Sequence, residues 1–330
     1  MFPQESSQET RNPQFDIYTE FKSCTQFYAR FHLLFLSFLF LQLLLFFLFL
    51  PHLNKSIISA FAPAVFLLTL FSYLVLLFFF QTKKTVQLLS LQKQFKLLQR
   101  SLYNSPIERA ESATKAASIL AQKELLFYNA KTAFSAIDPI ISKLKIRLHW
   151  KNFHAMKELL LLLSIEEITN LIKKTPTDLS LHTALAETYN ELSLLYLPPP
   201  FAWIPTAFFS EDNENKFSFF SERAIEEITI LQDYGLDDPW VHTTLANIYH
   251  LQKNTQEEIA EYEILHLMLP ENEEVLSNLG TLYFQEGCTA KGLKIYEKLL
   301  SISQVKAEKL IAHYGAYTSQ ETSFLSTNTA

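Results

Sequence analysis

A set of five residues near the C-terminal end of the chain recurs 34 positions later. In both copies a leucine, a small residue and a tyrosine are followed, on a later segment, by a tyrosine and a leucine. The first copy is Leu245, Ala246, Tyr249, Tyr262 and Leu265, and the second is Leu279, Gly280, Tyr283, Tyr296 and Leu299. A period of this length with apolar residues at helical spacing is typical of stacked helical hairpins, because one hairpin alone cannot bury its apolar stripe.

The same pattern continues upstream when one insertion is allowed. Residues 182–189 match residues 242–249, and residues 164–171 match residues 224–231, both at an offset of 60. Both offsets exceed the repeat period of 34 by the same number of residues, which indicates one insertion in the chain between the two copies. We expect this extra length of chain between a helix that ends near Leu195 and a helix that starts near Ser221.

These motifs resemble the tetratricopeptide repeat (TPR), whose pattern runs W-x-x-L-G-x-x-Y, then A-x-x-x-F, then P. The resemblance covers residues 137–318 and implies an all-α fold, a TPR-like α-solenoid. Small residues would let paired helices approach closely, and tyrosines would fill the space beside them. The repeat core that it implies is Leu185, Ala186, Tyr189, Leu245, Ala246, Tyr249, Leu279, Gly280, Tyr283 and Tyr296.

In this family the first helix of each hairpin lines a concave groove, which binds protein partners. The resemblance implies a partner-binding face made of Thr183, Glu187, Asn190, Glu191, Thr243, Asn247, His250, Leu251, Ser277, Thr281, Phe284 and Gln285. Some members grip a C-terminal carboxylate with basic groove residues, but those basic residues are missing here. A basic or amphipathic helical partner suits this acidic face better.

The insertion, at about 197–220, is rich in proline and aromatic residues. Its prolines forbid a continuous helix, and so many aromatic side chains on a loop need a surface to cover them. The aromatic residues singled out are Phe201, Trp203, Phe208 and Phe209. The sequence leaves three interpretations open: the loop folds back onto its own repeats, it docks a partner, or it plugs the groove.

Two apolar runs in the N-terminal part predict a transmembrane hairpin over residues 31–80. The spans lie at about 33–50 and 61–80, each close to the roughly 20 residues needed to cross a bilayer. Residues 1–30 form a polar N-terminal segment. The connector between the spans is short and contains a proline, so the two runs form a hairpin with the lipid bilayer as its partner.

Residues 81–136 continue the helical stripe beyond the second span and are predicted to form a basic helical stalk with a net charge of +6. Residues 137–330 carry a net charge of −12, which should repel nucleic acid. Lysines and arginines are more frequent before and after the hairpin than in its connector, so we expect both termini in the cytoplasm. Residues 319–330 are predicted to form a disordered tail.

No motif for catalysis is found. The five glycines all lie at or after Gly235, which excludes a phosphate-binding glycine loop. Cys24 and Cys288 share no metal-ligand spacing, and His182 and His242 take the tryptophan position of the repeat, where packing explains them. We therefore expect no enzyme, no cofactor and no metal.

Three functions remain open. The first is a membrane-anchored TPR scaffold or adaptor that binds protein partners through its cytoplasmic groove. The second is an inclusion-membrane-type protein, of the kind that intracellular bacteria secrete, presenting the repeats to host cytosol. The third is an oligomerising membrane hairpin or transport component with a regulatory repeat domain. The 29 phenylalanines and 5 glycines favour an AT-rich bacterial genome, which does not decide between these functions. We expect an integral protein of the bacterial inner membrane.

Overall fold

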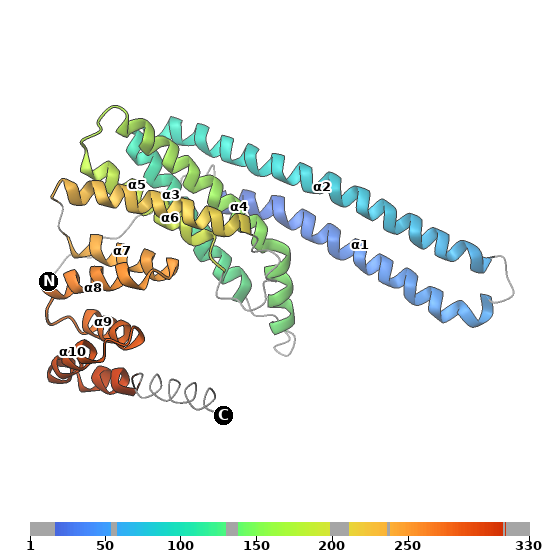
Figure 1. Cartoon of the computed structure of the whole chain (residues 1–330). Coiled ribbons are helices and arrows are strands. Elements are labelled where there is room, and N and C mark those ends of the chain that lie inside the picture. The colour runs from blue at the N-terminus through green and yellow to red at the C-terminus, as the bar shows by residue number, and fades with distance from the viewer. Residues whose placement is uncertain are drawn as a thin grey trace, which may run out of the picture. The chain divides into compact units, whose positions relative to one another are not determined.

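The computed structural model describes residues 17–53, 58–129, 138–198, 211–235, 238–312 and 314. Within these residues every regular element is a helix and there is no strand (Figure 1). The labelled helices are α1 (Ile17–Leu53), α2 (Ile58–Leu102), α3 (Pro106–Asn129), α4 (Asp138–Ile172), α5 (Leu179–Leu195), α6 (Glu211–Asp233), α7 (Pro239–Gln252), α8 (Thr255–Met268), α9 (Glu273–Gln285) and α10 (Thr289–Ile302). Residues 304–312 are also helical. The all-α prediction is confirmed for the part of the chain that the structure describes.

The chain divides into two compact units. Unit 1 comprises Met1–Pro176 and Leu195–Glu211, and therefore contains α1 to α4. Unit 2 comprises Thr177–Leu194 and Asp212–Ala330, with nearly all of α5 and α6 and the whole of α7 to α10. The aromatic residues predicted for the insertion, Phe201, Trp203, Phe208 and Phe209, lie outside the described residues, as does the 319–330 tail.

In unit 1, α1 and α2 are each long and apolar enough to cross a membrane. Only 6% of the most apolar 18-residue stretch of α1 and 0% of that of α2 is buried, so their apolar side chains point outward. A core helix of a soluble protein would bury most of such a stretch. The inner faces of the hairpin meet through aromatic and polar groups: Phe31 packs on Phe80 with ring centroids 4.5 Å apart, and Gln42 Nε2 donates to Thr69 Oγ1 at 3.4 Å.

Both helices of the hairpin extend past the membrane-crossing length and pack against α3 and α4. A helix of 37 or 45 residues, as α1 and α2 are, spans about 55 to 68 Å, well beyond a hydrocarbon core of about 30 Å. At the start of α1, the fully buried Phe21 packs against Phe153 of α4 with ring centroids 4.8 Å apart. At the end of α2, Gln92 Nε2 donates to the Leu159 carbonyl at 2.9 Å. The hairpin thus continues without a linker into a small helical bundle.

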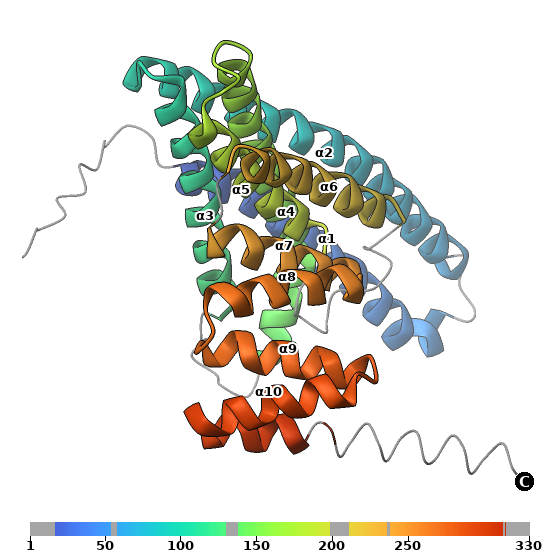
Figure 2. The same ribbon diagram turned by 60° about the vertical axis from the view of Figure 1, so that its left-hand side comes forward.

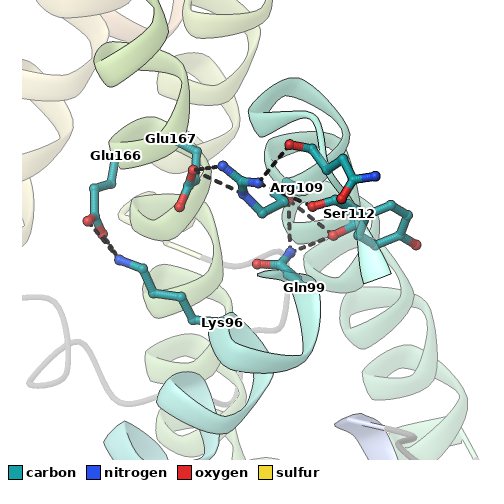
Figure 3. Close-up of polar contacts among 8 residues, drawn as sticks. Lys96, Gln99, Arg109, Ser112, Glu166 and Glu167 are labelled. Atoms are coloured by element: carbon teal, nitrogen blue, oxygen red, sulfur yellow. Dashed lines mark hydrogen bonds and ion pairs between the residues drawn. The ribbon is translucent and has the colours of Figure 1, made fainter. Parts of the chain in front are cut away.

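Two ion pairs fix the end of α2 and the start of α3 to α4, as Figure 3 shows. Lys96 of α2 pairs with Glu166 at 2.6 Å, and Arg109 of α3 pairs with the next residue, Glu167, at 3.2 Å. The Arg109 guanidinium also donates to the carbonyls of the loop between α2 and α3, and Gln99 Nε2 donates to the Arg109 carbonyl. The turn from α2 into α3 is therefore stabilised by the α4 carboxylates, by the Arg109 guanidinium and by the Gln99 amide.

In unit 2, consecutive helices bury one core after another. Residues of α5, α6 and α7 share one cluster, in which Ala186, Ala224 and Val241 are fully buried. A second cluster joins α7 to α8, α9, α10 and the helical residues 304–312. Helix α7 contributes to both, since Leu245 faces the first cluster and Ala246 the second. Figure 2 shows α7 to α10 lying one after another.

In unit 2, α7 and α9 begin at side-chain caps. The carboxylate of Asp238 accepts from the Trp240 amide at 2.9 Å, with Pro239 at the first helical position of α7. The Asn272 side chain accepts from the amides of Glu274 and Val275 at the start of α9. These caps satisfy amides that have no partner inside the helix.

One helix start and one division between predicted segments differ from the expectation. Helix α6 begins at Glu211, well before the start expected near Ser221. The segment 211–220 contains no proline, and its acidic residues favour the N-terminal end of a helix. Helix α4 is a single helix of 35 residues that packs against α3, so the segment after 137 is paired with part of the expected stalk.

Candidate functional site

The helix pairs of both units share one internal register. The first helices of the pairs are α3, α5, α7 and α9, and the second helices are α4, α6, α8 and α10. The fourth residues of the first helices are Arg109, His182, His242 and Leu276, and the eighth residues are Ala113, Ala186, Ala246 and Gly280. All four eighth residues are small and buried, which lets each pair approach closely.

In three of the four pairs the fourth residue of the first helix contacts the repeat-equivalent residue of the second helix. Glu167, Glu227 and Glu261 stand at the same offsets, 60 and then 34, as the sequence repeat. The contacts are Arg109 to Glu167 at 3.2 Å, His182 Nδ1 to Glu227 at 2.6 Å and His242 Nδ1 to Glu261 at 2.6 Å. In the α9–α10 pair, the equivalent residues Leu276 and Ile295 are both buried in the core. The same position between the two helices is thus occupied by a basic residue and a glutamate in three pairs, and by two aliphatic residues in the fourth.

The predicted core residues lie inside. Leu185, Leu245, Leu279, Tyr283 and the small residues beside them are buried, and Tyr189, Tyr249 and Tyr296 are partly buried against the same clusters. The Tyr283 hydroxyl hydrogen-bonds to Glu263 of α8, and together with burial this carboxylate raises the pKa of Tyr283 above its usual value. The tyrosines therefore pack with their rings inside and their hydroxyls toward polar groups.

A polar cavity of about 260 Å³ opens between α7, α8 and α9. Four of the predicted groove residues line it: Asn247 and His250 from α7, and Thr281 and Gln285 from α9. The other lining residues are Glu258 and Tyr262 from α8, and Asn278 and Leu282 from α9. The repeat register therefore brings the open faces of two successive first helices to one site.

The remaining predicted groove residues do not line this cavity. Thr183, Glu187, Asn190 and Glu191 lie exposed or half-buried on α5, and Thr243, Leu251 and Ser277 lie exposed or half-buried on α7 and α9. The placement of Phe284 on the open face was wrong. Phe284 is 5% exposed, its ring lies 4.9 Å from that of Tyr314, and it packs over Gly292, where even a Cβ atom would clash with it.

Polar contacts inside the cavity come mainly from residues that were not predicted as site residues. Asn278 Nδ2 donates to the Tyr262 hydroxyl at 2.9 Å. His250 Nδ1 lies 3.0 Å from Glu258 Oε1, and Glu258 is only 6% exposed. Burial raises the pKa of the Glu258 carboxyl, and the neighbouring His250 opposes that rise. A buried carboxylate in a small polar cavity is the most unusual feature of this face.

The chemistry of this site fits recognition of another molecule. The amides of Asn247, Asn278 and Gln285 each offer both donors and acceptors, which suits a peptide backbone. Among the described residues, no group of three or more histidine, cysteine, aspartate or glutamate side chains could hold a metal ion.

No protein-family model matches this chain, and a search of the curated proteins returns no match. A function is therefore inferred from the residues and from the geometry of the site.

Proposed function

We propose that this protein is a membrane-anchored scaffold or adaptor of the TPR type, which binds a protein partner through the open face of α7 and α9. The observation that carries the proposal is the polar cavity of about 260 Å³ on that face. It is lined by side chains with unlike donors and acceptors and is too small for most whole ligands, whose sites are roughly 300–1,000 Å³. Such a cavity suits part of an extended or helical peptide.

The shared register of the helix pairs supports a TPR-like solenoid. A small buried residue recurs at the eighth position of α3, α5, α7 and α9, and the fourth position contacts the second helix of its own pair. A chain in which each pair buries its core against the next presents its first helices along one continuous surface. We infer that α3 and α4 belong to the same series of pairs in sequence.

The membrane hairpin gives the scaffold its location. In our proposal the two apolar helices cross a bacterial inner membrane, and the basic residues that follow the apolar span within α2, from Lys83 to Arg100, keep both termini in the cytoplasm. Tethering to a membrane raises the local concentration of partners on the same surface, so that weak groove binding becomes useful.

Capture of the partner tests the groove. We would crosslink native membranes that carry the full chain and compare it with the double variant Asn247→Ala, Gln285→Ala. The matched control is Lys294→Ala, Glu297→Ala, two exposed residues of α10 outside the cavity. We expect one specific protein to be captured by the intact chain and the control and lost from the groove variant. Equal capture by all three would refute the groove as the binding surface.

The two cysteines test the orientation separately. Cys288 is exposed in the turn before α10, and Cys24 is half-buried in α1. In a Cys24→Ser variant, Cys288 is the single thiol of the chain. We expect a membrane-impermeant maleimide to label it only after bacterial cells expressing the protein are permeabilised. Labelling in intact cells would place the repeats on the outer side of the membrane.

A further inference from the structure

One position of the second helices is small in every pair except one. The equivalent residues of α4, α6, α8 and α10 are Ser164, Ala224, Glu258 and Gly292, at successive offsets of 60, 34 and 34. Ser164 and Ala224 are fully buried. At Gly292 a Cβ atom would clash with the Phe284 ring, so any side chain there would require that ring to move. A glutamate at such a position needs a specific reason.

The α7–α8 pair makes room for the glutamate through a second substitution. The residue opposite this position is Phe284 in the α9–α10 pair and His250 in the α7–α8 pair, one repeat period earlier. Phe284 turns inward and covers Gly292, whereas the His250 side chain is 68% exposed and only its ring nitrogen contacts Glu258. The space that an inward phenylalanine fills in one pair is thus open in the other, and the polar cavity lies there.

The carboxylate of Glu258 is incompletely balanced by the groups around it. Its side chain is 8% exposed, while His250, the histidine beside it, stands mostly in solvent. Burial outweighs that histidine, because the pKa of Glu258 is raised. Among the described residues that line the cavity there is no lysine or arginine. A cation that entered from outside would therefore form a strong, charge-assisted hydrogen bond with Glu258, because no lysine or arginine among the described lining residues competes for the carboxylate.

We propose that Glu258 forms the base of a pocket for one lysine or arginine side chain of the partner protein, and that this contact selects the partner. The inference rests on the proposed groove function and names the chemistry that the groove recognises. The cavity volume of about 260 Å³ is several times the roughly 30 Å³ share of one water molecule, which is room for a single long side chain. Asn247 and Gln285 at the rim would bind the peptide backbone on either side of that side chain.

The test uses the full chain in lipid nanodiscs and a library of capped nonapeptides, acetylated and amidated so that no terminal charge contributes. Each position in turn is fixed as lysine, arginine, glutamine or glutamate, and the bound peptides are identified by mass spectrometry. We compare the intact protein with Glu258→Gln. The matched control is Glu257→Gln, which makes the same change at the preceding, exposed residue of α8.

We expect the intact protein and Glu257→Gln to prefer a basic residue at one peptide position by about tenfold or more, the effect of one charge-assisted hydrogen bond. Glu258→Gln should bind peptides without that preference. If Glu258→Gln keeps the same basic preference, the pocket assignment is overturned while the groove function stands. If the intact protein retains no peptide at all, the groove function and the pocket fall together.

A second measurement needs no protein variant and decides the question even if Glu258→Gln does not fold. The best lysine peptide is compared with the same peptide carrying acetyl-lysine, or the best arginine peptide with citrulline, on the intact protein. Loss of the charge should weaken binding about tenfold or more. Equal affinity for the charged and the neutral peptide would overturn the proposal.

Discussion

The ion pair between Arg109 and Glu167 gives a prediction whose size follows from burial. The Glu167 side chain is 9% exposed and that of Arg109 is 17% exposed. Arg109→Ala removes the cationic partner of a buried carboxylate, together with two bonds to loop carbonyls that can turn to water. Breaking a buried pair in this way costs about 3–5 kcal/mol, and the partial exposure of Arg109 favours the lower end, about 3 kcal/mol.

The adjacent ion pair supplies the control. Lys96 and Glu166 are 24% and 54% exposed, so Lys96→Ala should cost no more than about 1 kcal/mol. We would measure hydrogen exchange of the α3 and α4 amides in the full chain in nanodiscs. A loss of about 3 kcal/mol raises the opening constant about 150-fold, whereas Lys96→Ala should raise it about fivefold at most. Similar effects of the two variants would refute the reasoning from burial.

Replacing both members of the buried pair separates the charge from the contact. An Arg109→Met, Glu167→Leu double variant leaves no buried charge behind, and such replacements are often neutral or stabilising. We expect its exchange rates to lie close to those of the intact protein and well below those of Arg109→Ala. If the double variant is as unstable as the single one, the pair contributes geometry that apolar side chains cannot replace.

Three further predictions follow from burial and packing. Burial, with a smaller contribution from Lys84, lowers the pKa of His149 to about 4. The free energy of unfolding should therefore fall by up to about 3 kcal/mol as the pH falls from 6.5 toward 4. In thermal unfolding, the stability of His149→Gln should decrease less over this pH range than that of the intact protein. Gly292→Ala should destabilise α10 by about 1–2 kcal/mol, because the clash with Phe284 exceeds the gain in helix propensity, and a Phe284→Leu background should reduce that cost. Because the pKa of Glu258 is raised, ionisation of its carboxyl destabilises the folded state. This destabilisation is absent below the unfolded pKa of 4.5 and reaches its full size above the raised folded pKa. Thermal unfolding of Glu258→Gln should therefore show a stability gain at pH 7 that shrinks as the pH falls toward 4.5, and Glu257→Gln should show none.

The sequence repeat predicted the helices of unit 2 well because its residues are packing residues. Leu245, Ala246, Leu279 and Gly280 lie where two helices must approach, so their spacing is fixed by the helices themselves. The repeat pattern did not reveal α3 as the first helix of a pair. At its seventh and eleventh positions α3 carries Ser112 and Ala116 in place of the leucine and tyrosine of the repeat, and only the small residue at the eighth position keeps the pattern.

The open face was predicted less well, because a groove position and a core position can lie one residue apart on a helix. Phe284 was assigned to the groove, but Gly292 leaves room for its ring and Tyr314 covers it. Glu258 went unnoticed for the opposite reason. A glutamate on a short helix usually faces water, and only its register with Ser164, Ala224 and Gly292 shows that it lies inside.

The most direct test of a membrane-anchored groove is a position scan with a photocrosslinking amino acid in native membranes. One variant would carry the probe at Thr281, which lines the cavity, and a second at Lys294, an exposed residue of α10 outside it. If the groove binds a partner, the probe at Thr281 forms a single discrete adduct with another protein and the probe at Lys294 forms none. Adducts of the same protein from both positions, or adducts only with a second copy of this chain, would contradict a partner-binding groove.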